Sequence, residues 1–179
     1  MMTKTFICFL LVIFFLGAGA NFAESSEAVK TAGDVGAVAV PAAALALAYV
    51  HDDKEGIMQL AEALAASAAA TYALKYTVNE TRPNGEKHSF PSLHTSVAFA
   101  GAAFVQQRDG WKYGLPLYVV SALVGASRIE AKEHHFQDVL AGAAIGVGAN
   151  LIFTKPYHKV TVTPVVENGI TGVMIGKSF

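Results

Sequence analysis

Apolar residues dominate two long segments in the first half of the chain, and their arrangement predicts helices. Residues 35–50 form an apolar run of 16 residues that contains Pro41, and a polar turn at residues 51–56 follows it. In residues 57–76 the apolar positions recur every three or four residues, which is typical of an amphipathic helix. We therefore expect a first helix kinked at Pro41 and a second, alanine-rich helix.

Three more helices are expected after a polar connection. The first begins at Ser92, a good N-cap, and extends to about residue 107, the next covers roughly residues 114–127, and the last covers about residues 134–153. The glycines of the last helix, which allow close contact between helices, are Gly142, Gly146 and Gly148. Short connections make consecutive helices run in opposite directions. The sequence thus predicts an all-α, up-down helical bundle of about five core helices.

The two ends of the chain differ from this bundle. Residues 1–20 have the positive start, the apolar run and the small-residue cleavage site of a secretory signal peptide, with an uncleaved membrane anchor as the alternative. Residues 21–159 are expected to form the helical domain. Residues 160–179 change period, which predicts a small C-terminal β-hairpin with its tight turn at Asn168-Gly169.

Composition limits what such a chain can do. It has 179 residues, of which 53% are hydrophobic and 15% charged, and its net charge is -1. This is the length of one domain, too apolar for a disordered protein and too neutral for a nucleic-acid binder. The only cysteine, Cys8, lies in the predicted signal, so the mature chain has no disulfide and no thiolate metal site. The polar residues 24–34 are expected to be irregular or weakly helical and show no sign of chemistry.

A charged, histidine-rich segment at residues 127–138 separates two apolar runs. If the chain is helical from His134 onward, His134 and Asp138 lie on one face, where a carboxylate holds an imidazole in one tautomer and raises its basicity. Such a pair is an orienter with a base, or an orienter with a nucleophile. We interpret Glu133 as a surface charge. The alternating helix directions bring to the same end of the bundle Lys75, Arg82, Ser92, His94, Arg128, His134 and Asp138.

These residue types are suited to a dense oxyanion such as phosphate. Arginine offers planar bidentate donors, lysine a point charge, and the start of a helix free backbone N–H groups. Two histidines beside such a pocket can divide phosphoryl transfer, one attacking phosphorus and the other protonating the departing oxygen. No cofactor or metal is required, because the cationic side chains neutralise charge on the phosphoryl oxygens.

Three motifs in this region resemble a known family. With their spacing, they are Lys75 followed after six residues by Arg82-Pro83, then Pro91-Ser92-Leu93-His94, then Ser127-Arg128 followed after five residues by His134 and after three more by Asp138. The order and spacing are similar to the three-part signature of the type 2 phosphatidic acid phosphatase superfamily. That superfamily also includes bacterial acid phosphatases and vanadium haloperoxidases, and the resemblance covers about a third of the chain.

The resemblance implies a role for each matched residue. It implies that His134 is the nucleophile that forms a phosphohistidine, that Asp138 orients it, and that His94 is the general acid. It implies that the phosphate is bound by Lys75, Arg82, Ser92, Leu93 and Arg128. Leu93 stands where the family usually has glycine, whose backbone N–H faces the phosphate, so the leucine side chain must find room.

The implied activity is that of a phosphatase acting on phosphomonoester or pyrophosphate groups, expected mainly on lipids. We expect an inner-membrane protein whose active site faces the periplasm. The alternatives are a soluble periplasmic acid phosphatase of broad specificity, a phosphotransferase, and a catalytically inactive envelope protein of the same fold. A metal hydrolase is a weaker alternative, with ligands drawn from His88, His94, His134, His135 and Asp138.

Overall fold

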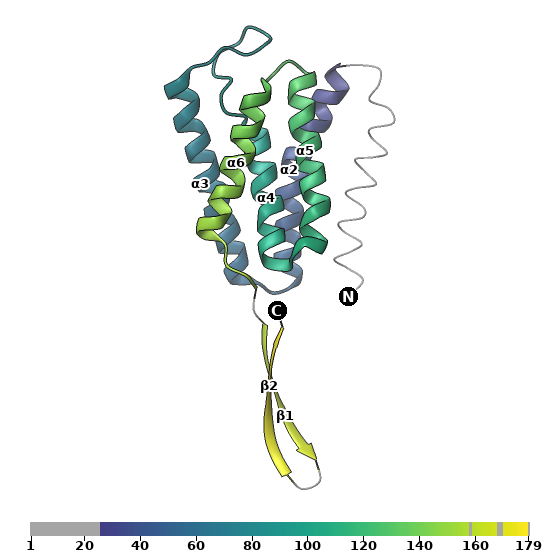
Figure 1. The fold of residues 1–179 in the computed structure, drawn as a ribbon. Helices are drawn as coiled ribbons and strands as arrows, with labels where there is room; N and C mark the ends of the chain where they lie inside the picture. Colours follow the sequence, from purple (N-terminus) through teal and green to yellow (C-terminus); the bar gives the residue numbers. More distant parts are fainter. Residues whose placement is uncertain (1–25, 158, 168–169, 179) are drawn as a thin grey trace.

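The computed structural model describes residues 26–157, 159–167 and 170–178, and within these ranges it contains five helices and two strands (Figure 1). The helices run in alternating directions. Their bounds are α2 Ser26–Val50, α3 Lys54–Val78, α4 Leu93–Asp109, α5 Trp111–Glu130 and α6 Phe136–Phe153. The predicted all-α bundle of about five helices is confirmed.

The two strands follow the bundle. Strand β1 (Lys159–Glu167) pairs antiparallel with β2 (Ile170–Ser178), so that Lys159 lies opposite Ser178 and Glu167 opposite Ile170. The tight turn expected at residues 168–169 lies outside the described residues, and so does the signal expected at residues 1–20. The hairpin and the signal therefore stay predictions.

The main difference from the expected boundaries is at α2. From Ser26 onward the segment expected to be irregular or weakly helical is part of a regular helix, and the helix continues through Pro41. The buried residues Gly33, Gly36 and Ala37 already follow the helical spacing there. The pattern does not predict a regular helix here, because Lys30 and Asp34 of these turns contact other polar groups and the segment lacks a hydrophobic period.

Helix α4 lies at the centre of the bundle, and the other four helices pack on it. Its buried face is made largely of alanine and glycine, with Phe104 and Val105 as its largest core side chains. Leu47 of α2 and Leu117 of α5 complete the core around it. Small residues let helix backbones approach closely, which matters where lipid rather than water surrounds the bundle.

Glycines set the distance between α4 and α6. A Cβ atom at Gly142 would lie 2.5 Å from the carbonyl oxygen of Ser92, and one at Gly146 would overlap the carbonyl oxygen of Ser96. The glycines that we expected to allow close contact therefore do so at two positions. Their effect is to hold the start of α6 against the start of α4.

A buried ion pair between Asp53 and Arg108 fixes the opposite end of the bundle. Arg108 Nε donates to Asp53 Oδ2 at 2.9 Å, and Arg108 Nη2 donates to the other carboxylate oxygen. Arg108 Nη1 donates to Gln59 Oε1 at 3.2 Å and to the Lys155 carbonyl at 2.7 Å. Asp53 also caps α3 by accepting from the Gly56 N–H at 2.9 Å. One arginine thus joins α4 to the α2–α3 turn and to the segment after α6.

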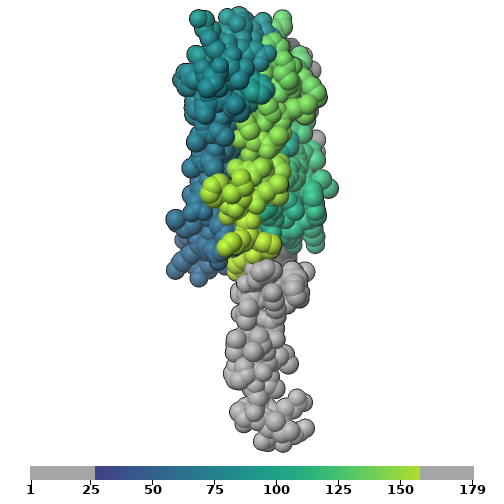
Figure 2. All heavy atoms as spheres, turned by 60° about the vertical axis from the view of Figure 1, so that its left-hand side comes forward, coloured from purple at the N-terminus to yellow at the C-terminus, as the bar shows by residue number. Residues whose placement is uncertain are grey.

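Three of the described helices are long and apolar enough to cross a membrane: α2 over Glu27–Val50, α3 over Lys54–Val78, and α6 over Phe136–Phe153. Helix α6 lies against α3 on one face of the bundle (Figure 2). Large apolar side chains such as Leu45, Leu74 and Leu140 are exposed on these helices. Extended apolar surface of this kind marks a membrane or protein contact. The chain is therefore a membrane protein.

We expect Gly142→Ala to destabilise the bundle by about 1–3 kcal/mol, the usual cost of an overpacked core. Gly148→Ala is the matched control, because nothing lies within 4 Å of a Cβ atom at Gly148. Alanine also forms helices better than glycine, so the control should be neutral or stabilising. Thermal unfolding of both variants in detergent measures the difference. An unchanged midpoint for Gly142→Ala would contradict the close contact of α4 with α6.

Candidate active site

The connections α3–α4 and α5–α6 meet at one end of the bundle, beside the first turns of α2 (Figure 1). The Asn84 N–H donates to the Lys132 carbonyl at 3.1 Å, which joins the two connections. The Ser92 N–H donates to the Asp138 carbonyl at 3.0 Å, which joins the start of α4 to the start of α6. All three sequence motifs therefore reach the same end of the molecule.

His134 and Asp138 form a buried pair, with 3% and 0% of their surfaces exposed. His134 Nδ1 lies 3.3 Å from Asp138 Oδ2. The pair does not lie on one helical face as expected, because α6 begins only at Phe136 and His135 is its N-cap. His134 lies just before the helix, and Asp138 reaches back to it from the first turn. With a histidine at the cap position, the helix begins two residues later than the charge pattern predicts.

The Asp138 carboxylate is held by more than the histidine ring. Its Oδ2 atom accepts a hydrogen bond from the His135 N–H at 2.8 Å and another from the Ser89 hydroxyl. These donors come from two different connections of the bundle. The position of the carboxylate is therefore fixed by these donors independently of its contact with His134.

The pKa of His134 is lowered to about 4, mainly by burial and in addition by the charges of Lys75 and Arg82. Asp138 acts in the opposite direction through its charge and its hydrogen bond, but it does not outweigh them. The imidazole is therefore neutral above about pH 4. A neutral ring keeps the lone pair that a nucleophile needs.

Lys75 and Arg82 both lie beside this pair. Lys75 Nζ donates to the carbonyl oxygens of His88 at 2.7 Å and Ser89 at 3.3 Å, which anchors the α3–α4 connection over the end of α3. Arg82 Nη1 donates to Glu86 Oε2 at 3.2 Å and to Glu133 Oε2. The two cations approach the His134 ring from the end of α3 and from the connection that follows it.

Arg128 is almost completely buried, with 1% of its surface exposed. Its Nε atom donates to the Ser127 hydroxyl at 3.2 Å, its Nη1 atom to Asp34 Oδ1 at 2.6 Å, and its Nη2 atom to the Lys30 carbonyl. The guanidinium is thus held between α5 and the first turns of α2. A planar cation fixed in this way presents its donors in one orientation.

The second motif forms the start of α4. Ser92 is the N-cap, and its hydroxyl accepts from the Thr95 N–H at 3.5 Å and from the Thr95 hydroxyl at 3.0 Å. Leu93 is the first helical residue and is half-buried. Its backbone is helical, not left-handed, so leucine causes no backbone strain where the family usually has glycine. Its N–H belongs to the helix terminus, where backbone donors favour an anion.

His94 follows on the same turn and is the more accessible of the two histidines, with 41% of its side chain exposed. Its Nε2 atom lies 3.0 Å from Asp34 Oδ1. The pKa of His94 lies below its ordinary value, because burial and the Arg128 charge lower it more than the Asp34 and Glu133 carboxylates raise it. Both histidines therefore lie close to cations, but only His94 faces solvent.

The structure thus brings all of the predicted site residues to one end of the bundle, and it adds residues that the sequence reasoning missed. These are Lys30 and Asp34 on α2, Ser89 in the α3–α4 connection, and Glu133 before His134. Glu133, interpreted as a surface charge, is instead 9% exposed and accepts from Lys30 and Arg82. Although burial raises the pKa of this carboxyl, those two cations lower it below its ordinary value. The helical spacing of Lys30 and Asp34 was the one available signal.

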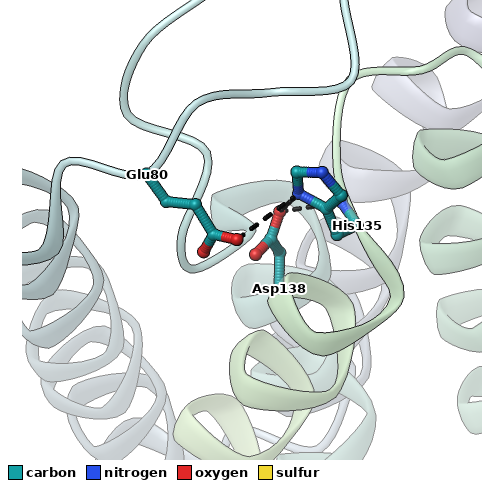
Figure 3. Close-up of side chains that lie close together, drawn as sticks. All are labelled: Glu80, His135 and Asp138. Atoms are coloured by element: carbon teal, nitrogen blue, oxygen red, sulfur yellow. Dashed lines mark hydrogen bonds and ion pairs between the residues drawn. The ribbon is translucent and has the colours of Figure 1, made fainter.

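Glu80, His135 and Asp138 form the only group of potential metal ligands in the described part of the chain, with ligand atoms within 4.8 Å of one another (Figure 3). His135 Nδ1 lies 3.7 Å from Glu80 Oε1 and 3.5 Å from Asp138 Oδ2. Only two of the five residues suggested for a metal hydrolase belong to this group. The cap of α6 already accounts for the contact between His135 and Asp138.

Comparison with known proteins gives a family match and several relatives. The PAP2 superfamily profile matches residues 56–161, more than half of the chain. The chain is 30% identical over 117 residues to the lipid A 4'-phosphatase of Helicobacter pylori, and this alignment covers 59% of each protein. It is 38% identical over 90 residues to lipid phosphate phosphatase 1 of Arabidopsis thaliana, and that alignment covers 40% of the chain and 28% of the plant protein. The chain thus spans less than two thirds of either relative.

A solved structure shares the fold. The crystal structure of Aquifex aeolicus LpxE superposes with a TM-score of 0.61 at 24% identity, over 83% of this chain and 90% of that one. At this level of identity the likeness concerns the arrangement of the helices.

We expect His134 to titrate near pH 4 and to remain neutral above that value. Lys75→Met removes a charge that lowers this pKa, so the titration should move upward, toward the ordinary value of 6.5. Lys132→Met is the control, because Lys132 is an exposed residue of the same end. NMR of the histidine rings, with His134→Gln to assign the signal, measures both titrations. A His134 pKa that does not respond to Lys75→Met would show that the lysine does not act on this ring.

Proposed function

The chain belongs to the PAP2 superfamily, and we propose that it is a membrane phosphatase that removes phosphate from lipid phosphates or pyrophosphates through a phosphohistidine. The observation that carries the proposal is the buried His134–Asp138 pair, with a neutral imidazole beside Lys75 and Arg82. A buried histidine oriented by a carboxylate and surrounded by cations has the chemistry of a nucleophile for an anionic group. Arg128 and the start of α4 complete the surroundings of the bound phosphate.

The first half of the reaction forms the phosphohistidine. Because His134 Nδ1 faces Asp138, its proton is held there and Nε2 is left to attack phosphorus. The N–P bond forms as the bond from phosphorus to the leaving oxygen breaks. His94 gives its proton to that oxygen, and the dephosphorylated lipid leaves as an alcohol or, from a pyrophosphate, as a monophosphate.

The second half reverses these roles. His94, now neutral, takes a proton from a water molecule that attacks phosphorus on the side that the leaving group vacated. The N–P bond breaks, inorganic phosphate is released, and His134 and His94 return to their starting states. Charge on the phosphoryl oxygens is neutralised by Lys75, Arg82 and Arg128, with further donors from the Ser92 hydroxyl and the Leu93 N–H.

A groove between α2 and α3 supports a lipid substrate. It has a volume of about 640 Å³ and begins one helical turn below the site, at Val97 of α4 and at Ala37 and Val38 of α2. Its remaining lining is apolar and comes from Pro41, Ala42, Leu45, Ile57, Leu60, Ala61, Leu64, Ala65 and Ala68. An apolar groove that begins one helical turn from a phosphate site fits an acyl chain of a lipid whose phosphate lies at the rim.

The site would face the periplasm. This orientation rests on the predicted export signal, because a chain that enters α2 from outside returns to the outer side at the end of α3, where the site lies. The lipid phosphate would then be taken from the outer leaflet of the inner membrane. Residues 1–20 would be the signal and residues 21–159 the catalytic domain.

His134→Ala is expected to reduce phosphate release by more than about 10³-fold, because it removes the atom that bonds to phosphorus. His135→Ala is the matched control: the neighbouring histidine caps α6, so its loss should affect stability more than turnover. Phosphate release from a panel of lipid phosphates measures both variants. Rapid quenching with radiolabelled substrate should trap an acid-labile, alkali-stable phosphoprotein in the parent and not in His134→Ala. Equal activity of His134→Ala and the parent would exclude the phosphohistidine.

Ala61→Phe is expected to place a ring in the groove and to lower kcat/KM for long-chain lipid phosphates by about tenfold, the scale of a misfilled apolar pocket. The same change should leave short-chain, water-soluble phosphate esters unaffected. Ala69→Phe is the matched control, an exposed alanine of the same helix that does not line the groove. Equal loss on both substrate classes would contradict an acyl site. Equal use of both classes by the parent would instead favour a phosphatase of broad specificity.

A further inference from the structure

We propose that Asp34 is a positioning residue of this site, which holds the Nε2 atom of His94, favours protonation of this ring, and weakens the binding of free phosphate. The proposal rests on the function proposed above. Asp34 lies outside the three sequence motifs and outside the matched residues 56–161. Its role follows from what its carboxylate contacts.

One carboxylate oxygen connects two groups of the site. Asp34 Oδ1 accepts from Arg128 Nη1 at 2.6 Å and lies 3.0 Å from His94 Nε2. Arg128 is a phosphate ligand in the proposed mechanism, and His94 is the acid. The carboxylate therefore interacts with the same donors that a phosphoryl oxygen and a leaving oxygen would use.

The backbone of α2 holds Asp34 in this place. The Lys30 carbonyl accepts from Arg128 Nη2, and a Cβ atom at Gly33 would overlap the Arg128 guanidinium and the Ser127 hydroxyl. The helix therefore approaches Arg128 as closely as glycine permits. The Asp34 side chain itself is 46% exposed, so it has room to turn away from His94 when a leaving oxygen takes the same N–H.

The charges around His94 explain why a carboxylate is needed. Arg128 of α5 and Arg82 of the α3–α4 connection disfavour a protonated ring, whereas Asp34 of α2 and Glu133 of the α5–α6 connection favour it. Without Asp34, two guanidinium groups would face the ring against one carboxylate, which itself already binds Lys30 and Arg82. An acid must carry its proton at the working pH, so Asp34 extends the pH range of His94 as an acid.

The same carboxylate opposes the binding of an anion. A phosphate entering beside Arg128 meets a negative charge that is already in contact with the guanidinium, and it must share or displace that contact. Asp34 thus has two opposite effects: it supports proton donation and reduces affinity for the phosphate dianion. If Asp34 only supported the fold, its loss would not weaken proton donation by His94 while strengthening phosphate binding.

Asp34→Asn tests the proposal because it keeps the shape of the side chain and removes its charge. In NMR titrations of the full chain in detergent, the His94 pKa should fall by about one unit, equivalent to tenfold in the proton equilibrium. The alkaline limb of kcat should move to lower pH by a similar amount. The inhibition constant of inorganic phosphate should decrease several-fold, on the order of a lost like-charge contact. Asp34→Glu should restore all three towards the parent values.

Glu27→Gln is the matched control, because it removes one carboxylate from the exposed start of the same helix. It should change none of the three quantities. An unchanged His94 titration in Asp34→Asn, or a loss of phosphate affinity together with a loss of kcat, would overturn the proposal. The NMR readout does not depend on turnover, so it separates failure of this inference from failure of the phosphohistidine mechanism, which His134→Ala tests.

Discussion

The site depends on the contacts that hold the Asp138 carboxylate in place. This carboxylate lies in the first turn of α6, accepts hydrogen bonds from Ser89 and from the His135 backbone, and contacts the ring of His134. A fully buried carboxylate is costly unless several donors compensate it, and these donors come from both connections that form the site. The same residue therefore starts a helix, anchors the loop that holds Lys75, and orients the histidine. Moving it would disturb all three at once.

Helix packing supplies the support for this arrangement. Gly142 and Gly146 let α6 lie directly on α4, so the starts of these two helices, where Asp138 and Ser92 lie, are held at a fixed distance. At the far end the Arg108–Asp53 pair joins α4 to the α2–α3 turn. In a lipid environment helix association relies on close packing and polar contacts. This chain has close glycine packing near the start of α4 and a polar contact at its end.

The helices and the location of the site could be predicted from the sequence, for physical reasons that are easy to identify. Apolar segments and helix-start signals predict all five helices, and short connections force their directions, which is enough to gather the motif residues at one end. The first turns of α2 and the role of Glu133 could not be predicted in this way. Their polar side chains are satisfied by other polar side chains of the site, as with Lys30 and Glu133, so burial leaves no hydrophobic pattern. The start of α6 was misplaced because a histidine cap is not a usual helix signal.

The unequal exposure of the two histidines bears on the stereochemistry of the reaction. His134 is sealed inside the bundle at 3% exposure, whereas 41% of the His94 side chain is open to solvent. Leaving group and incoming water must therefore use the same side of phosphorus, the side of His94. Each of the two displacements in the proposed mechanism inverts the configuration at phosphorus, so a chiral phosphoryl group would be released with its original handedness. In the proposed mechanism, the burial of one imidazole therefore places both displacements on the same side of phosphorus, and the overall transfer would proceed with retention.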